Sequence, residues 1–125
     1  MRAITEQVVN AFLQGKAMSK GNSGVSVDSQ WIHMELFGHK IARRENTEGP
    51  VTFLWMNNKG YTTNTTKERL NGLGSHFGVN IWQHKFAWYW SSRTECKSPF
   101  ASNEWVLVYC PTSAQRLILE VDHGR

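Results

Sequence analysis

The segment NIWQHKFAWYW, residues 80–90, places five aromatic rings, one histidine and one lysine within eleven positions. Aromatic residues favour β-strands, so this composition restricts the segment to extended structure. If it forms one continuous strand, the even-numbered side chains share the more apolar face. We therefore predict that Trp82, Phe86 and Trp88 are core residues beneath a sheet. The alternative is that the rings form an exposed surface on which a ligand stacks.

The chain of 125 residues has the composition of a single folded domain, residues 1–125. It is 40% hydrophobic and 19% charged, a balance that disfavours a disordered protein. The sequence contains no apolar run of about eighteen residues and no secretory signal, which predicts a cytoplasmic protein. Cys96 and Cys110 form no CxxC pair. Two free thiols are therefore expected, with a disulfide as the alternative.

Three regions follow one another along the chain. Residues 1–15 carry an apolar stripe at helical spacing that ends at Gly15, so we expect an N-terminal helix. Residues 16–30 are rich in Gly, Ser and Lys and have no apolar period, which is typical of a flexible basic linker. Residues 31–125 are expected to form a β-rich core with one inserted helix.

Short apolar runs indicate the strands of this core. Residues 31–44 predict two strands that turn at Gly38, and residues 51–57 predict another that ends at the turn NNKG. Residues 105–110 and 116–121 predict a C-terminal hairpin. A strand followed by a helix is the alternative for this last pair.

The inserted helix is expected within TNTTKERLNGLG. Thr65 followed at the third position by Glu68 matches a capping box, so the helix is predicted to begin at Thr66. Together the elements predict an α+β fold, a twisted antiparallel β-sheet of about five to seven short strands with two short α-helices. The residues that this helix is expected to present to solvent are Lys67, Arg69 and Asn71.

No catalytic or metal-binding motif is recognisable in the sequence. There is no GxSxG elbow, and the only aspartates are Asp28 and Asp122. The segment HME resembles half of a zinc-deaminase motif, but the PCxxC half is absent. The five histidines show no ligand spacing such as HxxxH. We therefore expect no enzymatic activity, no metal and no cofactor.

Basic residues give the best indication of a binding surface. The net charge is +4, and residues 1–93 carry eleven Lys and Arg against six Asp and Glu. Lys and Arg beside exposed rings suit an acidic partner protein, and they also suit nucleic acid, whose bases stack on rings. The candidate binding residues are Arg43, Arg44, Lys67, Arg69, Asn71, Lys85, Tyr89, Trp90 and Arg93.

Three motifs carry a resemblance. LFGHKIARR, TNTTKERLNGLG and VNIWQHKFAWYW are similar, over residues 36–90, to the motifs of a set of small uncharacterised tailed-bacteriophage proteins. The chain departs from the pattern at an inserted His84 and at WSSR, where an Asn-Gly turn is usual. The resemblance implies a phage origin and action in the bacterial host cytoplasm, and it implies no particular activity. The matching positions are Gly38, Ile41, Ala42, Thr65, Thr66, Arg69, Leu70, Asn71, Gln83, Lys85, Trp88 and Tyr89.

Small phage proteins without enzymatic activity commonly act by stoichiometric binding. We therefore hypothesise that this protein binds a host protein or protein complex and inhibits or modulates it, with CRISPR or another defence system, transcription or a nuclease as candidate targets. The alternative is a nucleic-acid-binding accessory protein that holds DNA or RNA on a basic and aromatic sheet face. Neither hypothesis involves a membrane or a small-molecule cofactor.

Overall fold

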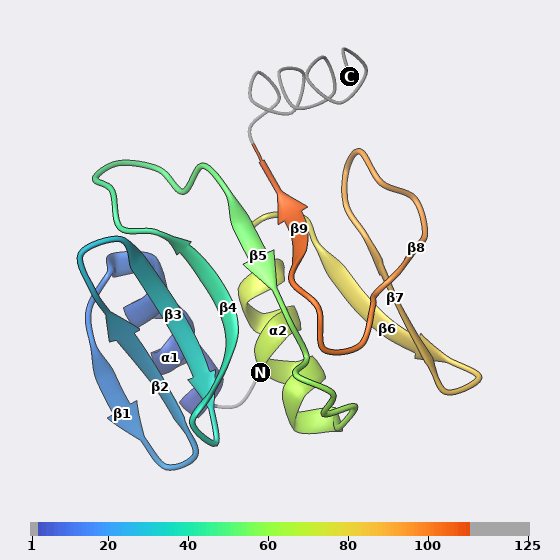
Figure 1. Ribbon diagram of the computed structural model, residues 1–125, viewed down its shortest axis with the longest axis horizontal. Coiled ribbons are helices and arrows are strands. Elements are labelled where there is room, and N and C mark those ends of the chain that lie inside the picture. The colour runs from blue at the N-terminus through green and yellow to red at the C-terminus, as the bar shows by residue number, and fades with distance from the viewer. Residues whose placement is uncertain (1–2, 111–125) are drawn as a thin grey trace.

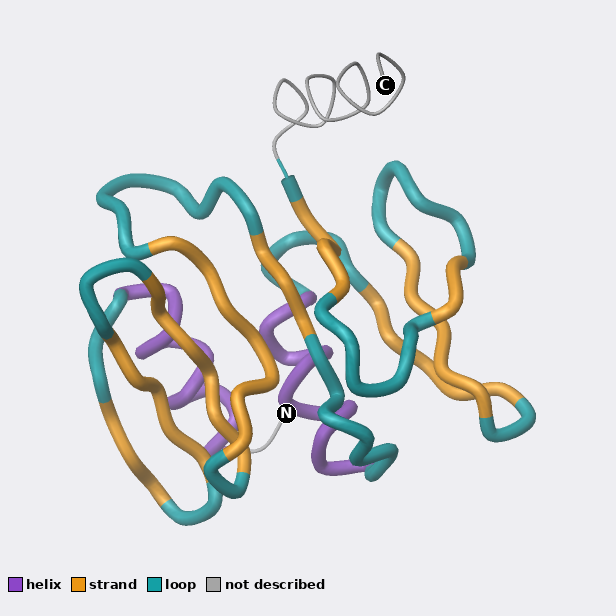
Figure 2. The backbone as a smooth tube through the Cα atoms, viewed as in Figure 1, coloured by secondary structure: helices purple, strands orange, loops and turns teal. Residues whose placement is uncertain are grey.

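The structure, a computed structural model, describes residues 3–110. These residues form two helices and nine strands (Figure 1). Figure 2 shows that long loops separate several of the strands. In chain order the elements are α1 (Ala3–Gln14), β1 (Met18–Lys20), β2 (Ser23–Val27), β3 (Trp31–Leu36), β4 (His39–Glu45), β5 (Leu54–Met56), α2 (Asn64–Gly74), β6 (Asn80–His84), β7 (Ala87–Ser91), β8 (Ser98–Pro99) and β9 (Val106–Tyr109).

All the strand pairs in the described residues are antiparallel. The larger sheet has the order β1-β2-β3-β4-β5-β9, and the smaller sheet has the order β6-β7-β8. α1 packs on β1, β2 and β3, whereas α2 contacts α1, β4 and β6 and so joins the two sheets. The predicted α+β class with two helices is confirmed. The strands number nine in two sheets rather than five to seven in one, because two hairpins form that the sequence did not indicate.

One continuous hydrophobic core lies between the helices and the sheets. Val8 and Phe12 of α1, Met34 of β3 and Leu70 of α2 are fully buried in it, and Trp88 of β7 is 4% exposed. The apolar stripe of α1 faces this core, as its helical spacing predicts. Burial of such side chains is the main stabilising term, at about 25 cal/mol for each Å² of apolar surface.

The predicted flexible linker over residues 16–30 is wrong for its central part, where β1 and β2 form a hairpin. Ser23 and Val25 are buried at alternate positions of β2, while Gly24 faces the other way. A Cβ at Gly24 would lie 2.9 Å from the backbone oxygen of Met18, so this close strand approach requires glycine. Composition is misleading here because small residues that allow close packing also characterise linkers.

The other strand predictions for the larger sheet are confirmed. β3 and β4 turn at Gly38, β5 lies within residues 51–57, and β9 lies within residues 105–110. β5 pairs with both β4 and β9, which brings distant parts of the chain side by side. The predicted C-terminal run at residues 116–121 lies outside the described residues.

Helix α2 begins earlier than predicted. Its N-cap is Thr63, whose Oγ1 accepts a hydrogen bond from the backbone N–H of Thr66 at 3.2 Å. The predicted capping box is wrong, because Thr65 lies inside the helix and Glu68 accepts a hydrogen bond from Thr5 of α1 instead. Several threonines precede the apolar positions, and the sequence does not show which one leaves the helical conformation.

The aromatic segment 80–90 is a hairpin and not one strand. His84 pairs with Ala87 across a two-residue turn. The turn reverses the alternation, so the core face carries odd positions before it and even positions after it. The core prediction is therefore confirmed for Trp88, is wrong for Phe86, which is 93% exposed, and is wrong for Trp82, which lies half-buried on the outer face.

Two other expectations concern the cysteines and the membrane. Cys96 is exposed, Cys110 is half-buried, and both are free thiols, as expected. Burial raises the pKa of Cys110 above its usual value. Within residues 3–110 no helix has the length and apolar character needed to cross a membrane.

Candidate functional site

Arg44, a predicted binding residue, is buried at the end of α1. Its Nε and Nη2 donate to the backbone oxygen of Phe12 at 3.2 and 3.1 Å, and Nη2 also donates to that of Leu13 at 3.1 Å. Carbonyls at a helix C-terminus lack intrahelical partners and favour a cation. Burial lowers the pKa of Arg44. The guanidinium caps α1 and is not exposed to a partner.

Arg69 is also buried, at 1% exposure, so the prediction that it faces solvent is wrong. Its Nη1 donates to Thr5 Oγ1 at 2.6 Å and to Glu68 Oε1 at 2.7 Å. Nε donates to Ser23 Oγ at 2.9 Å, and Nη2 donates to Asn22 Oδ1 at 3.3 Å. One guanidinium therefore joins α1, α2 and the β1–β2 hairpin.

Lys67 and Asn71 are half-buried and attach the smaller sheet to α2. The side-chain amide of Asn71 donates to the backbone oxygen of Ile81 and accepts from its N–H, both at 2.8 Å. Lys67 Nζ donates to Gln83 Oε1 at 3.2 Å and lies 5.9 Å from the centre of the Trp88 ring. Both side chains act in positioning the β6–β7 hairpin.

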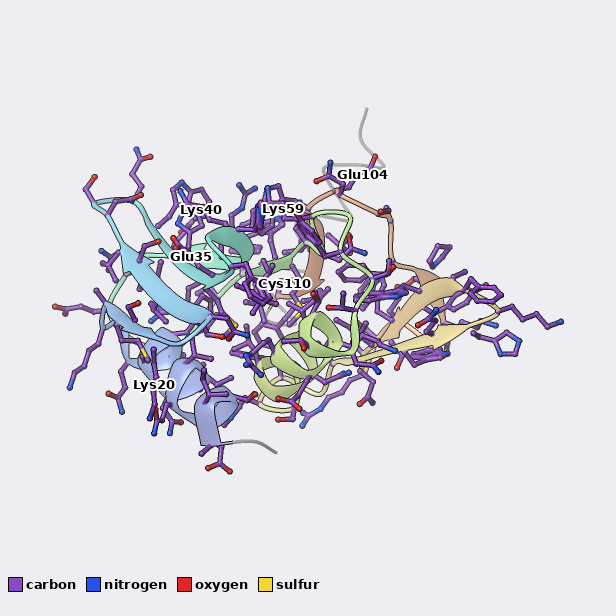
Figure 3. All side chains as sticks on the ribbon, turned by 90° about the horizontal axis from the view of Figure 1, so that it is seen from below. Lys20, Glu35, Lys40, Lys59, Glu104 and Cys110 are labelled. Atoms are coloured by element: carbon purple, nitrogen blue, oxygen red, sulfur yellow. The ribbon has the colours of Figure 1, made fainter. Side chains whose placement is uncertain are left out.

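Arg43 lies among tryptophans on the face of the larger sheet that the helices leave uncovered. Its Cζ is 4.4 Å from the ring centre of Trp105, 4.9 Å from that of Trp31 and 5.3 Å from that of Trp55. Lys59, labelled in Figure 3 on the side opposite the helices, stacks on the Trp105 ring at 5.1 Å. The Arg43 cation is thus covered by rings, and burial lowers its pKa.

The outer face of the β6–β7 hairpin carries Tyr89, one of the predicted residues, in an aromatic stack, and Lys85 lies at the tip of the hairpin. Trp82 and Tyr89 are cross-strand partners with ring centres 6.1 Å apart, and Lys97 Nζ lies 4.5 Å from the Tyr89 ring. The hairpin projects beyond the rest of the described chain (Figures 1 and 2). We call this set the outer hairpin surface: Trp82, His84, Lys85, Phe86, Tyr89 and Lys97.

Trp90 and Arg93 belong to the base of the same hairpin. Trp90 is half-buried and packs against the hydrophobic core. Arg93 is exposed and lies beside Gly78, in the loop before β6. Neither side chain is part of the outer hairpin surface.

The tip of the hairpin holds bulky residues in a backbone conformation that suits glycine. Lys85 has φ 50° and Phe86 has φ 69°. Two positive φ values define a type I′ turn, in which Asn-Gly is the favoured pair. An L-residue in the left-handed region costs about 1–2 kcal/mol, and an exposed phenyl ring recovers none of this by burial. Folding stability therefore does not explain Phe86.

A second phenylalanine is placed in the same way. Phe37, at the β3–β4 turn, has φ 51° and is 68% exposed, and Gly38 follows it with φ 79°. The sequence predicts the turn at Gly38 but not the exposure of Phe37, and it gives no indication of the turn at Lys85-Phe86. The pair Lys85-Phe86 contains no Gly or Asn, so local turn signals are absent, and the inserted His84 is the departure from the family motif that lies next to this turn.

Groups that would support metal or acid–base chemistry are dispersed. The described residues contain no cluster of three or more His, Cys, Asp and Glu side chains able to hold a metal ion. Burial, with the nearby charge of Lys40, lowers the pKa of His33 on the uncovered sheet face. Backbone N–H groups of Trp31 and Gln30 lower the pKa of Asp28, at the β2–β3 turn.

Comparison with protein-family models identifies a family. A family model described as Kyanoviridae Gp96 protein, a bacteriophage family, matches residues 1–107. The match extends the resemblance over residues 36–90 to most of the chain. Comparisons with curated proteins and with solved structures found no significant match.

Proposed function

The chain belongs to the Kyanoviridae Gp96 protein family of bacteriophages, and from this premise we propose that it binds a host protein or protein complex stoichiometrically and inhibits or modulates it. Defence, transcription and nuclease machinery are the candidate targets. The observation that carries the proposal is Phe86, which is 93% exposed in a left-handed conformation at the tip of a projecting hairpin. The proposed role needs no catalytic group.

The outer hairpin surface has the chemistry of a protein-binding anchor. Aromatic side chains dominate the binding energy of interfaces, where each buries a large area at a small entropic cost. Phe86 supplies an exposed ring, and the Trp82–Tyr89 stack supplies a rigid base for it. Lys85 and Lys97 make the surround positive, which suits an acidic patch on the partner.

Nucleic-acid binding is the second candidate, and the placement of the arginines weighs against it. Arg44 and Arg69 are buried in internal hydrogen bonds, and Arg43 is stacked among indole rings. Each phosphate contact contributes a slope of about −0.7 to −0.9 in the logarithmic salt dependence, so tight binding requires several free cations. Because these three arginines are not available to a ligand, the predicted basic surface provides few phosphate contacts.

The proposal is tested with Phe86→Gly and Phe86→Trp as baits in a pull-down from host lysate, with and without nuclease. Wild type and Phe86→Trp should capture the same host protein after nuclease treatment, and Phe86→Gly should lose it. Phe37→Gly is the matched control, because it removes the same residue type from the same turn conformation on another hairpin. It should capture the partner as wild type does.

Two results would count against the proposal. Capture that disappears with nuclease in every bait would favour nucleic acid as the ligand. Equal capture by wild type and Phe86→Gly would remove the outer hairpin surface as the binding site.

A further inference from the structure

The face of the larger sheet that the helices leave uncovered is rich in aromatic rings. Trp55 of β5 packs edge-on against Trp31 of β3 at 5.7 Å and stacks on Phe53 at 5.8 Å, measured between ring centres. The open face of an antiparallel sheet usually carries polar residues. Four half-buried residues make up what we call the aromatic sheet face: Trp31, Phe53, Trp55 and Trp105.

Two cations on this face lack an anionic partner. Arg43 Cζ and Lys59 Nζ lie 4.4 and 5.1 Å from the centre of the Trp105 ring, and both side chains are half-buried. Within residues 3–110 neither cation forms an ion pair with a carboxylate. Positive charges withdrawn from water without a counter-charge are unfavourable. This part of the face is therefore complementary to an anion.

The acidic side chains of the same sheet lie away from these two cations. Glu35 accepts a hydrogen bond from Ser26 at 2.6 Å and is the cross-strand neighbour of Lys40. Glu45 lies at the end of β4, across from Trp31. The uncompensated positive charge is therefore concentrated around the indole that precedes β9.

We propose that the aromatic sheet face docks an acidic segment of a partner protein. An apolar side chain of that segment packs on the rings of Trp55 and Trp105, and a neighbouring carboxylate meets the Lys59 ammonium. Arg43 is covered by rings and does not touch the segment, but its charge adds to the attraction. A single accessible ammonium gives too few phosphate contacts for nucleic acid. The proposal does not depend on Phe86, because the two surfaces share no residue.

The six tryptophans give separate reporters for an NMR titration of the ¹⁵N-labelled full chain. The indole N–H signals of Trp31, Trp55 and Trp105 report on the aromatic sheet face, and that of Trp82 reports on the outer hairpin surface. The probe is the peptide Ac-Glu-Glu-Leu-Glu-Glu-NH₂, which we expect to bind with a Kd of about 1 mM and to shift the first three signals only. The peptide with Gln in place of Glu should bind at least about tenfold more weakly.

The key variant is Lys59→Gln, which removes the accessible cation and should weaken binding of the acidic peptide at least about fivefold. Lys20→Gln is the matched control, because Lys20 lies on the helix side of the molecule whereas Lys59 lies on the opposite side (Figure 3). It should bind the peptide as wild type does.

Several results would overturn the proposal. They are a wild-type titration without shifts, shifts confined to Trp82, equal binding of the Gln peptide, and unchanged affinity in Lys59→Gln. Tighter binding of hexathymidylate than of the acidic peptide, with shifts of the same three indoles, would also overturn it and identify the face as a nucleic-acid surface. The wild-type titration needs no variant to fold, and host capture by Phe86 is measured separately.

Discussion

Two arginines point inward in the helix-backed part of the molecule, where Arg44 caps α1 and Arg69 joins both helices to the first hairpin. In the projecting β6–β7 hairpin the reverse holds, because Phe86 points into solvent while Trp88, two residues away, is buried. The first region uses polar groups to fix its packing. The β6–β7 hairpin exposes an apolar ring, that of Phe86, which does not contribute to the packing.

This contrast supports the proposal that the β6–β7 hairpin is the binding surface. A buried cation with its donors satisfied stabilises one arrangement of the chain and presents nothing to a partner. An exposed ring in a strained turn has no folding benefit, which supports the proposal that it serves in binding. Residue type alone would assign the opposite roles, since arginine is the usual surface residue and phenylalanine the usual core residue.

The largest expected effect is at Arg69. Arg69→Ala should lower the free energy of unfolding by about 3–5 kcal/mol, because it leaves a buried cluster of polar groups without its central donor. Urea denaturation measures this loss. Lys67→Ala, two residues earlier on the same helix, removes one exposed hydrogen bond, from Lys67 to Gln83. It should lower the free energy of unfolding by less than about 1 kcal/mol. Equal losses in the two variants would mean that the inward network does not hold the helices.

The second effect separates the two faces of the hairpin. Trp88→Ala should cost about 3–5 kcal/mol, because it removes a buried indole from the core. Trp82→Ala, on the outer face, should cost less than half as much because Trp82 is only half-buried. Denaturation monitored by circular dichroism compares them. A larger loss at Trp82 would reverse the assignment of the faces.

A third, smaller effect tests the start of α2. Thr63→Ala should cost about 1 kcal/mol, the usual value for loss of an N-cap. Thr65→Ala should change the free energy of unfolding by less than about 0.5 kcal/mol, because Thr65 lies within the helix and caps nothing. Thermal unfolding of both variants gives the comparison, and the opposite ranking would restore Thr65 as the cap.

The smallest effect is the pH dependence contributed by His33. Its pKa in the folded protein is lowered by burial and by Lys40, while the unfolded value is about 6.5. The unfolded state therefore binds the proton more readily, and stability should fall as pH drops below 6.5. For each protein, the loss in free energy of unfolding is measured relative to its own value at pH 8. This loss should be smaller for His33→Gln than for wild type. An unchanged slope would show that His33 titrates alike in both states.

The sequence was informative where the fold is locally determined. The apolar stripe of α1 and the turn at Gly38 each specify an element through nearby residues, and the structure contains both. The turn at Lys85-Phe86 carries no such signal, because neither residue favours positive φ. Without a turn signal, the segment reads as one strand whose side chains alternate between two faces. This reading places Phe86 in the core, which is wrong.

The candidate site was harder to predict for a related reason. Arg44 and Arg69 become buried only because segments distant in sequence bring acceptors to them, as with Arg69 and Thr5, whose positions differ by 64. No local sequence pattern predicts a contact between residues so far apart in the chain.

The central claim, that Phe86 is kept for binding and not for folding, is tested most directly by Phe86→Gly. Glycine relieves the left-handed strain, so the free energy of unfolding should rise by about 1 kcal/mol. The affinity for the captured host partner should fall about 30-fold or more, as for loss of an aromatic anchor worth about 2 kcal/mol. A variant that is both more stable and equally tight in binding would contradict the account.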